Sequence, residues 1–237
     1  MFLYQPQNGY CYNSDTHFLY DFFSLALKKY KNIQGDILDI GSGSGILGLL
    51  LVRDYPKLNL YQVEIQKDFQ FLSQKNADIN MINSYLYKGD ICQIEFNRQF
   101  DYIVSNPPFY SSNVIKSENR NIKIARYNDF MPLEQFIKKV SKLLKNNGKF
   151  IFCYDPKQLN DIIYLLKIFK LNIEYIRFLY PKDDKNATLV MIYAKKGSKS
   201  VVNILPSLIM FNNDGKFTQE VENIYKKSAT YSIKCEI

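Results

Sequence analysis

The apolar residues of this chain recur with two spacings that alternate along most of its length. Short runs rich in apolar residues predict a buried strand at residues 36–40 and further strands at residues 58–64, 84–88, 100–105, 149–154, 173–180 and 188–195. Apolar positions three and four residues apart predict helices at residues 15–30, 46–54, 67–80, 132–145 and 157–169. Strands that alternate with helices favour an α/β fold with a doubly wound, mostly parallel, seven-stranded sheet and helices on both faces.

Residues 198–237 differ in character from the rest of the chain. They combine an apolar extended stretch at 201–211, an Asn-Asp-Gly turn and a short helix expected from Thr218. We therefore expect residues 1–197 to form one domain, in which residues 1–33 make an N-terminal helical cap. The last segment is expected to be a C-terminal extension that packs on or beside the core.

Composition narrows the classes of function. Lys and Arg number 31 against 23 Asp and Glu, and the resulting net charge of +8 suits a polyanionic partner such as RNA. A general abundance of Lys would produce the same balance. The four cysteines are widely spaced and His17 is the only histidine, so no metal site is expected. Without a recognisable leader or a long apolar run, we expect a cytoplasmic protein, a monomer or weak homodimer, that does not bind membranes.

The segment from Asp39 to Gly45 joins the first predicted strand to a helix and has the pattern D-x-G-x-G-x-G. Gly41, Gly43 and Gly45 allow a tight turn and a close approach of the backbone to a ligand, because no Cβ intervenes. The spacing differs from the GxGxxG of nicotinamide-dependent dehydrogenases, and an acid would repel their pyrophosphate. Asp39 can instead bind the cationic aminoacyl end of S-adenosylmethionine, directly or through water. Glycine-rich turns also serve packing alone, so this interpretation needs support elsewhere.

Acids at the ends of the next two strands supply that support. Glu64 ends the second strand, where a carboxylate can accept hydrogen bonds from both ribose hydroxyls. Asp90 follows the third strand and can accept from the adenine amine, while the Ile91 N–H donates to the ring. The sequence therefore predicts S-adenosylmethionine as cofactor, S-adenosylhomocysteine as its product, and no metal.

The residues Asn106, Pro107, Pro108 and Phe109 follow the fourth strand and predict the reaction. The exocyclic amine of adenine is a poor nucleophile, because its lone pair is delocalised into the ring. The Asn106 side-chain oxygen and the Pro107 carbonyl can accept its two N–H bonds and free that lone pair. Phe109 can stack on an extruded base, and Tyr110 can extend that surface. Asn-Pro-Pro in isolation is an ordinary turn, but its place after this strand favours catalysis.

A polar loop after this motif carries Arg120, Lys123 and Arg126. These side chains can bind the phosphates around a flipped nucleotide, and a solvated basic loop is an equally simple interpretation of each residue taken singly. They are our candidates for contacts with an RNA substrate.

Together these residues resemble the class I, Rossmann-like methyltransferases that carry the N-P-P-[FY] signature of amine methylation. Within that group the chain is similar to the bacterial tRNA1(Val) adenine-37 N6-methyltransferases, although Lys takes most basic positions. The resemblance implies methylation of the adenine N6 next to a tRNA anticodon, and implies that Tyr10 and Asp15 close over the cofactor. The matching residues are 7–10, 15, 39–47, 106–110, 125–126, 178–181, 205–206, 214–215 and 217–218.

Other activities share parts of this pattern. A release-factor glutamine N5-methyltransferase uses the same motif but usually has a helical domain before the glycine loop, which begins here by residue 39. A ribosomal RNA guanine-N2 methyltransferase would have the same motif and cofactor site. A DNA adenine methyltransferase would need a target-recognition domain, for which no segment is long enough. A noncatalytic RNA-binding protein on a degenerate methyltransferase fold would be expected to lack Asn106 or a loop glycine, and both are present.

Overall fold

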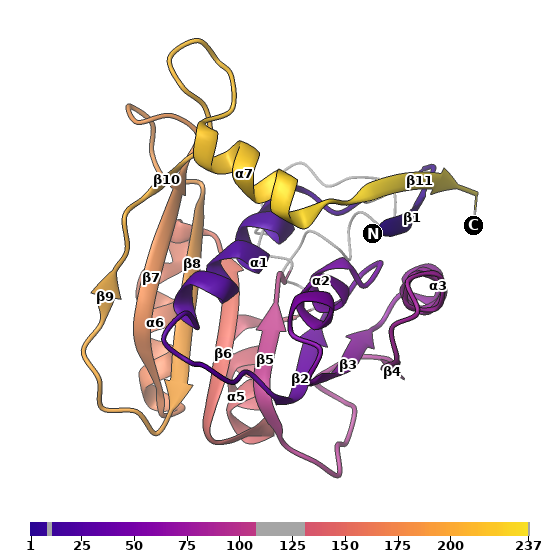
Figure 1. The fold of residues 1–237 in the computed structure, drawn as a ribbon. Helices are drawn as coiled ribbons and strands as arrows, with labels where there is room; N and C mark the ends of the chain where they lie inside the picture. The colour runs from indigo at the N-terminus through magenta and orange to yellow at the C-terminus, as the bar shows by residue number, and fades with distance from the viewer. Residues whose placement is uncertain (9–10, 108–130, 237) are drawn as a thin grey trace.

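A computed structural model describes residues 1–8, 11–107 and 131–236 of the chain. Within these residues, nine strands form the main sheet, and seven of them correspond to the strands expected from the apolar pattern (Figure 1). In spatial order they are β10 (Leu208–Ile209), β7 (Leu171–Tyr180), β8 (Leu189–Lys196), β6 (Leu144–Tyr154), β5 (Phe100–Ser105), β2 (Gly35–Ile40), β3 (Leu58–Glu64) and β4 (Ser84–Lys88), with β9 (Asn203–Ile204) also paired to β7. Neighbouring strands are parallel, except that β8 runs antiparallel to β6 and β7. This is the doubly wound, mostly parallel sheet that the alternating pattern predicts.

Helices cover both faces of the sheet (Figure 1). On one side lie α1 (Ser14–Ala26), α2 (Ile46–Asp54), α3 (Lys67–Ile79) and α7 (Gln219–Ser228), and on the other lie α5 (Leu133–Leu143) and α6 (Leu159–Ile168), the latter preceded by the short 3-10 helix η2 (Pro156–Gln158). None of the helices in the described ranges is both long and apolar enough to cross a bilayer.

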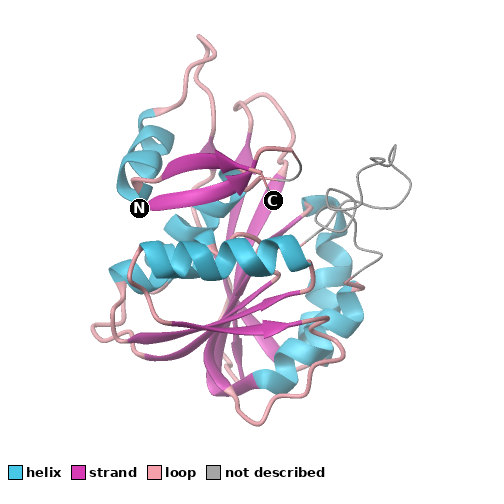
Figure 2. Ribbon diagram, turned by 90° about the vertical axis from the view of Figure 1, so that its right-hand side faces the viewer, coloured by secondary structure: helices cyan, strands magenta, loops and turns pink. Residues whose placement is uncertain are grey.

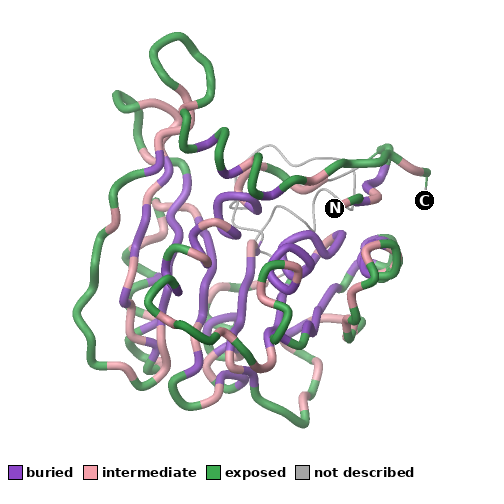
Figure 3. Tube along the Cα trace, viewed as in Figure 1, coloured by how far each residue is buried: buried purple, intermediate pink, exposed green. Residues whose placement is uncertain are grey.

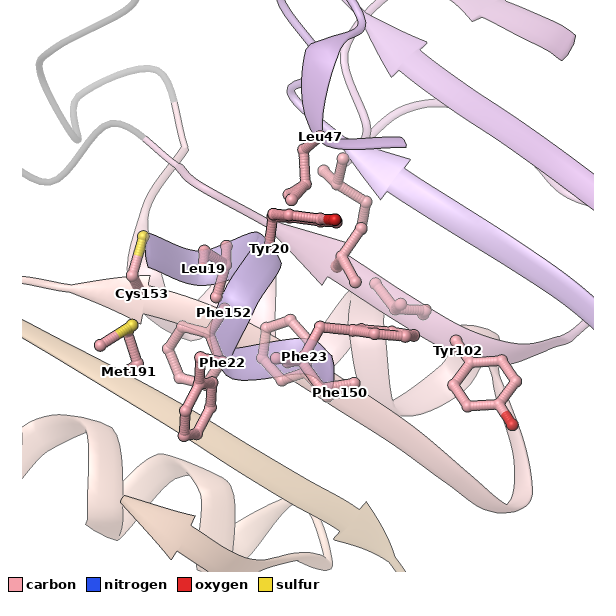
Figure 4. Packing of buried hydrophobic residues seen from close by; sticks show 14 of the residues in the cluster. Leu19, Tyr20, Phe22, Phe23, Leu47, Tyr102, Phe150, Phe152, Cys153 and Met191 are labelled. Atoms are coloured by element: carbon pink, nitrogen blue, oxygen red, sulfur yellow. The ribbon is translucent and has the colours of Figure 1, made fainter. Parts of the chain in front are cut away.

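The hydrophobic core fixes α1 against the middle of the sheet. Phe22 and Phe23 are fully buried, and they pack over the stacked rings of Phe150 and Phe152 on β6, whose centroids are 4.2 Å apart (Figure 4). Burial of one such side chain stabilises a fold by about 1.5–3 kcal/mol. The buried positions follow the central strands and α1, whereas the segment around β9 is mostly exposed (Figure 3). The first turn of α1 is therefore held at the carboxyl ends of the central strands.

A second sheet consists of two parallel strands, β1 (Phe2–Pro6) and β11 (Tyr231–Cys235). The pair lies outside the main sheet and beside α3 (Figure 2). The Asn76 side chain of α3 holds β1, because it accepts from the Tyr4 N–H at 2.7 Å and donates to the Tyr4 carbonyl at 3.0 Å. The cap expected as helical at residues 1–33 therefore begins with a strand, and residues 198–237 supply that strand's partner.

Candidate active site

The glycine loop lies at the carboxyl ends of β2 and β3, in backbone conformations that favour glycine. Gly41, Gly43 and Gly45 have φ angles of +68°, +55° and +87°. A Cβ on Gly45 would lie 2.9 Å from Gln62 Nε2 and 3.0 Å from Ser73 Oγ, so a larger residue would have to displace buried side chains. The loop thus turns tightly into the N-terminus of α2.

Asp39 precedes this loop and is only 1% exposed. Its Oδ2 accepts a hydrogen bond from the Gly48 N–H of α2 at 2.9 Å. Burial, reinforced by the nearby charge of Glu64 and opposed by the Gly48 hydrogen bond, raises the pKa of Asp39 to about 7. A cation in contact with such a carboxyl would stabilise its ionised form, so this position fits a positively charged ligand group.

The Glu64 carboxylate connects β3 to the glycine loop. Its Oε2 accepts from the Gly43 N–H at 2.8 Å, and its Oε1 accepts from the Gln66 N–H at 2.8 Å. The side chain is buried, and burial raises the pKa of the carboxyl. Because an ionised carboxylate has about four acceptor positions, Glu64 can shape the loop and still accept from ligand hydroxyls.

A cavity opens beside the glycine loop. Its wall includes Thr16, Asp39, Gly41, Ser42, Gly43 and Asn106. The structure therefore places the predicted acid, two of the glycines and the predicted catalytic asparagine around one space. The buried Ser42 Oγ in this wall has no hydrogen-bond partner among the described residues, which leaves a polar group for a ligand to satisfy.

Asp90 and Ile91 follow β4 and lie outside the wall of this cavity. Asp90 Oδ1 accepts from the Cys92 N–H at 2.8 Å, and the Asp90 carbonyl accepts from the Gln93 and Ile94 N–H groups. Ile91 is 2% exposed and packs in the core. The described contacts of Asp90 therefore build the turn after β4.

Asn106 follows β5, and two buried groups contact its amide. The amide nitrogen Nδ2 donates to Thr16 Oγ1 of α1 at 3.1 Å, and the Cys153 thiol of β6 donates to the amide oxygen Oδ1 at 3.0 Å. The residue before it, Ser105, donates from its hydroxyl to the Ile40 carbonyl at 2.8 Å, which ties the end of β5 to β2. The Asn106 side chain is thus held by α1 and β6, and the residue before it is held by β2. Asn106 reaches the cavity from the end of β5.

The first turn of α1 stands beside Asn106. Asp15 Oδ2 accepts from Asn13 Nδ2 at 2.8 Å, and burial raises the pKa of the Asp15 carboxyl. Its charge also contributes to raising the pKa of Cys153, as expected for two groups that lie close together. Tyr12, just before this turn, lines the cavity.

The sequence reasoning missed Tyr12, Thr16 and Cys153. No local signal marks Cys153, because its contact depends on the parallel pairing of Ser105 of β5 with Phe152 of β6, which brings the following residue of each strand to the same edge. Thr16 directly follows Asp15, which the family resemblance names as a candidate cofactor residue. The following predicted site residues lie outside the described residues: Tyr10, Pro108, Phe109, Tyr110, Arg120, Lys123 and Arg126.

This arrangement suits the transfer of a group between two bound molecules. Asp39 can hold the cationic part of one molecule, and the Asn106 amide oxygen can accept an N–H from another. Pro107 is buried directly after Asn106. Its backbone offers a second carbonyl acceptor and, because it is a proline, no N–H donor. In the described ranges, no group of three His, Cys, Asp or Glu side chains could hold a metal ion.

Known proteins resemble this chain in sequence and in fold. The family model described as a methyltransferase small domain matches residues 21–171. A tRNA1(Val) (adenine(37)-N6)-methyltransferase of Pedobacter heparinus is 30% identical over 158 residues, which cover 65% of this chain and 67% of that protein. A release factor glutamine methyltransferase of Flavobacterium psychrophilum is 30% identical over 142 residues, covering 54% of this chain and 48% of that protein.

Solved structures agree on the architecture. A predicted O-methyltransferase from Agrobacterium tumefaciens superimposes with a TM-score of 0.69 at 16% identity, covering 92% of this chain and 98% of its own. Its low sequence identity makes it evidence for the fold alone. The family model, by contrast, spans well over half of the chain. The chain therefore belongs to the methyltransferase small domain family and has the Rossmann-like fold of class I methyltransferases.

Proposed function

We propose that this protein transfers a methyl group from S-adenosylmethionine to the exocyclic N6 amine of an adenine in RNA. The proposed substrate nucleotide is adenine 37 of tRNA1(Val). The observation that carries the proposal is the position of Asn106, whose amide is fixed at the wall of the same cavity that Asp39 and the glycine loop line. Membership of the family implies S-adenosylmethionine as the methyl donor.

The residues of the cavity fit that cofactor. Asp39 would hold the cationic aminoacyl end, and the Ser42 hydroxyl, which has no partner among the described residues, would hydrogen-bond nearby. Gly41 and Gly43 let the backbone approach the ligand, and Glu64 would accept from the ribose hydroxyls. Asp90 and Ile91 would complete this site, as the sequence pattern predicts, and Tyr10 and Asp15 would close over it, as the family resemblance implies. S-adenosylmethionine supplies an electrophilic methyl group on a sulfonium.

The protein's part in the reaction is to bind and orient the amine. Asn106 Oδ1 and the Pro107 carbonyl would each accept one N–H of the amine, which draws the nitrogen toward a tetrahedral geometry and frees its lone pair. Pro108 would stiffen the turn, and Phe109 with Tyr110 would stack on the extruded base. Held in this way, the amine would direct its lone pair at the methyl group that bound S-adenosylmethionine supplies, with sulfur keeping the electron pair of the broken bond, and the amine would lose one proton to solvent.

An RNA substrate agrees with the charge of the chain and with the name of a relative. The net charge is +8, and the loop that carries Arg120, Lys123 and Arg126 directly follows the catalytic motif. A polyanion gains affinity from such cations by counterion release. The Pedobacter heparinus relative is named for adenine 37 of tRNA1(Val), which is the nucleotide proposed here.

A glutamine side chain of a release factor is the second candidate substrate. The Flavobacterium psychrophilum relative carries that activity in its name and has the same identity of 30%. A carboxamide also presents two N–H bonds on a nitrogen whose lone pair is delocalised, so the contacts of Asn106 and Pro107 would serve both substrates. A guanine-N2 amine of ribosomal RNA has the same chemistry and is a further outcome of the test.

The deciding experiment is a methylation assay with labelled S-adenosylmethionine. The purified protein is incubated separately with total tRNA, ribosomal RNA and release factor from a strain that lacks this gene, and the product is identified by mass spectrometry. We expect N6-methyladenosine in one tRNA, mapped next to the anticodon, and its loss in the Asn106→Ala variant with cofactor binding retained. Label confined to ribosomal RNA or to a release factor would overturn the proposed substrate.

A further inference from the structure

The amide of Asn106 is held from two sides by residues that the sequence reasoning did not assign. On one side Thr16 Oγ1 accepts from Nδ2 at 3.1 Å, and on the other the Cys153 thiol donates to Oδ1 at 3.0 Å. The two partners come from different elements, α1 and β6, which pack against each other beside the end of β5 (Figure 4 shows Cys153 beside α1). Both polar atoms of the Asn106 amide, Nδ2 and Oδ1, are therefore held in place.

Both partners are shielded from solvent, which makes their contacts persistent. Cys153 is fully buried and Thr16 is 4% exposed, whereas Asn106 itself is half-buried at the cavity. Burial and the nearby charge of Asp15 raise the pKa of Cys153 well above its ordinary value. The thiol therefore keeps its proton at physiological pH and remains a donor.

The Cys153 contact selects one orientation of the amide, whereas the Thr16 hydroxyl, which can accept or donate, can pair with either end of it. A flipped amide would turn Nδ2 toward the Cys153 sulfur, which is a weak acceptor, and would leave the thiol proton without the oxygen. In the observed orientation the thiol occupies one lone pair of Oδ1 and the second remains available. A hydrogen bond from the substrate amine requires a free lone pair on this oxygen, and Asn106 lines the cavity in which the amine would react.

We propose that Thr16 and Cys153 are positioning residues that hold the Asn106 amide oxygen in the orientation needed to accept the substrate's N–H. The inference rests on the proposed function of Asn106, and it extends that function by assigning the groups that set its geometry. Their contribution is made when the amine reacts, so the loss of either lowers kcat. Loss of Cys153 should leave cofactor affinity nearly unchanged, whereas Thr16 also lines the cavity. Cys153 lies outside the cavity wall, which makes it the cleaner of the two tests.

The first test compares matched variants in the tRNA methylation assay. Cys153→Ala removes the donor and Cys153→Ser keeps one, while Thr16→Val removes the acceptor and Thr16→Ser keeps it. We expect kcat to fall about 5- to 20-fold in Cys153→Ala and Thr16→Val, with the serine variants restoring it to within about threefold of wild type. The KM for S-adenosylmethionine should change less than about twofold in the Cys153 pair. In an Asn106→Ala background the Cys153→Ala change should have no further effect, because the positioned group is gone.

The second readout is independent of turnover. In protein labelled with ¹⁵N-asparagine, the side-chain NH₂ signal that disappears in Asn106→Ala belongs to Asn106. We expect its hydrogen exchange to be slow in wild type and at least about tenfold faster in Thr16→Val and Cys153→Ala. Thr16→Ser and Cys153→Ser should keep the slow exchange. Should one alanine or valine variant fail to fold, the other pair still decides the question.

The outcomes separate this inference from the proposed function. A wild-type protein that methylates no RNA contradicts the proposed substrate, and the NMR comparison alone then decides whether Thr16 and Cys153 hold the amide. An active wild type whose Cys153→Ala and Thr16→Val variants keep full kcat overturns the positioning role. The same conclusion follows if exchange of the Asn106 amide is unchanged in both variants.

Discussion

The affinity for cofactor should depend on pH through Asp39. Burial raises the pKa of this carboxyl to about 7 in the unliganded protein, so it changes charge within the range in which binding is easily measured. If the cationic aminoacyl end of the ligand binds the ionised form, the protein must lose a proton from Asp39 on binding at low pH. The affinity should therefore rise with pH and level off above 7.

The expected size follows from the ionised fraction. With a pKa of about 7, roughly one molecule in ten carries an ionised Asp39 at pH 6 and roughly nine in ten at pH 8. Because the apparent dissociation constant is the intrinsic one divided by the competent fraction, Kd should fall about tenfold over this range. At pH 6.5 binding should release about three quarters of a proton from this group.

Isothermal titration with S-adenosylhomocysteine, which binds without turnover, measures both quantities. Titrations in buffers with different ionisation enthalpies give the number of protons released. Asp39→Asn is the control, because it keeps an acceptor for the Gly48 N–H but cannot ionise. Any slope that remains in this variant comes from the ligand or from other groups. A wild-type Kd that changes less than twofold between pH 6 and 8, or an equal slope in the control, would refute the reasoning.

Three further predictions concern stability. His17 is buried with its Nδ1 unpartnered among the described residues, and burial lowers its pKa to about 4. As pH falls, this histidine is therefore protonated in the unfolded chain before it is protonated in the folded one. The free energy of unfolding should fall by about 3 kcal/mol between pH 6.5 and pH 4. Urea titrations at several pH values should show this loss in wild type and not in His17→Phe. Gly45→Ala should cost about 2–4 kcal/mol in urea unfolding, because strain at positive φ adds to contacts of 2.9 and 3.0 Å. Gly43→Ala meets no atom of the described residues within 4 Å and should cost about 1 kcal/mol. Asn76→Ala should lower the melting temperature more than Asn80→Ala. Asn76 is fully buried and its loss leaves backbone groups of β1 unpaired, whereas Asn80 is half-buried. Equal shifts in melting temperature would contradict this.

Much of the fold follows from local patterns in the sequence. The strands expected at 58–64, 84–88 and 100–105 and the helix expected at 46–54 are found with the same bounds. Three of these segments are short apolar runs with mostly buried positions, whereas residues 84–88 form a partly exposed strand at the edge of the sheet. The helix expected from Thr218 is also confirmed, and the Thr218 side chain accepts from the Val221 N–H at its N-terminus.

Other features depend on contacts between distant parts of the chain. Residues 146–148, which separate the helix expected at 132–145 from the strand expected at 149–154, lie inside β6, where pairing with β5 shifts register and Asn147 adopts a φ of +63°. The helix expected at 15–30 ends at Ala26, before a basic cluster that faces solvent. β11 has mostly exposed residues and therefore no apolar signal, and only its pairing with β1 makes it a strand. The contacts of Asn106 likewise depend on which strands are neighbours, which local spacing does not specify.

The pairing of β1 with β11 sets an order of events during synthesis. Tyr12, which lines the cavity, shares a hydrogen bond of 2.6 Å with Ser232, 220 residues away. The Gln5 side chain of β1 donates to Ser44 Oγ of the glycine loop at 2.5 Å. Because the ribosome makes β1 long before β11, the main sheet can assemble while this brace is still incomplete. We therefore expect a nascent chain that stops short of β11 to have a folded core but a loosely supported glycine loop. Such a chain should bind the cofactor only after β11 has been made and has paired with β1.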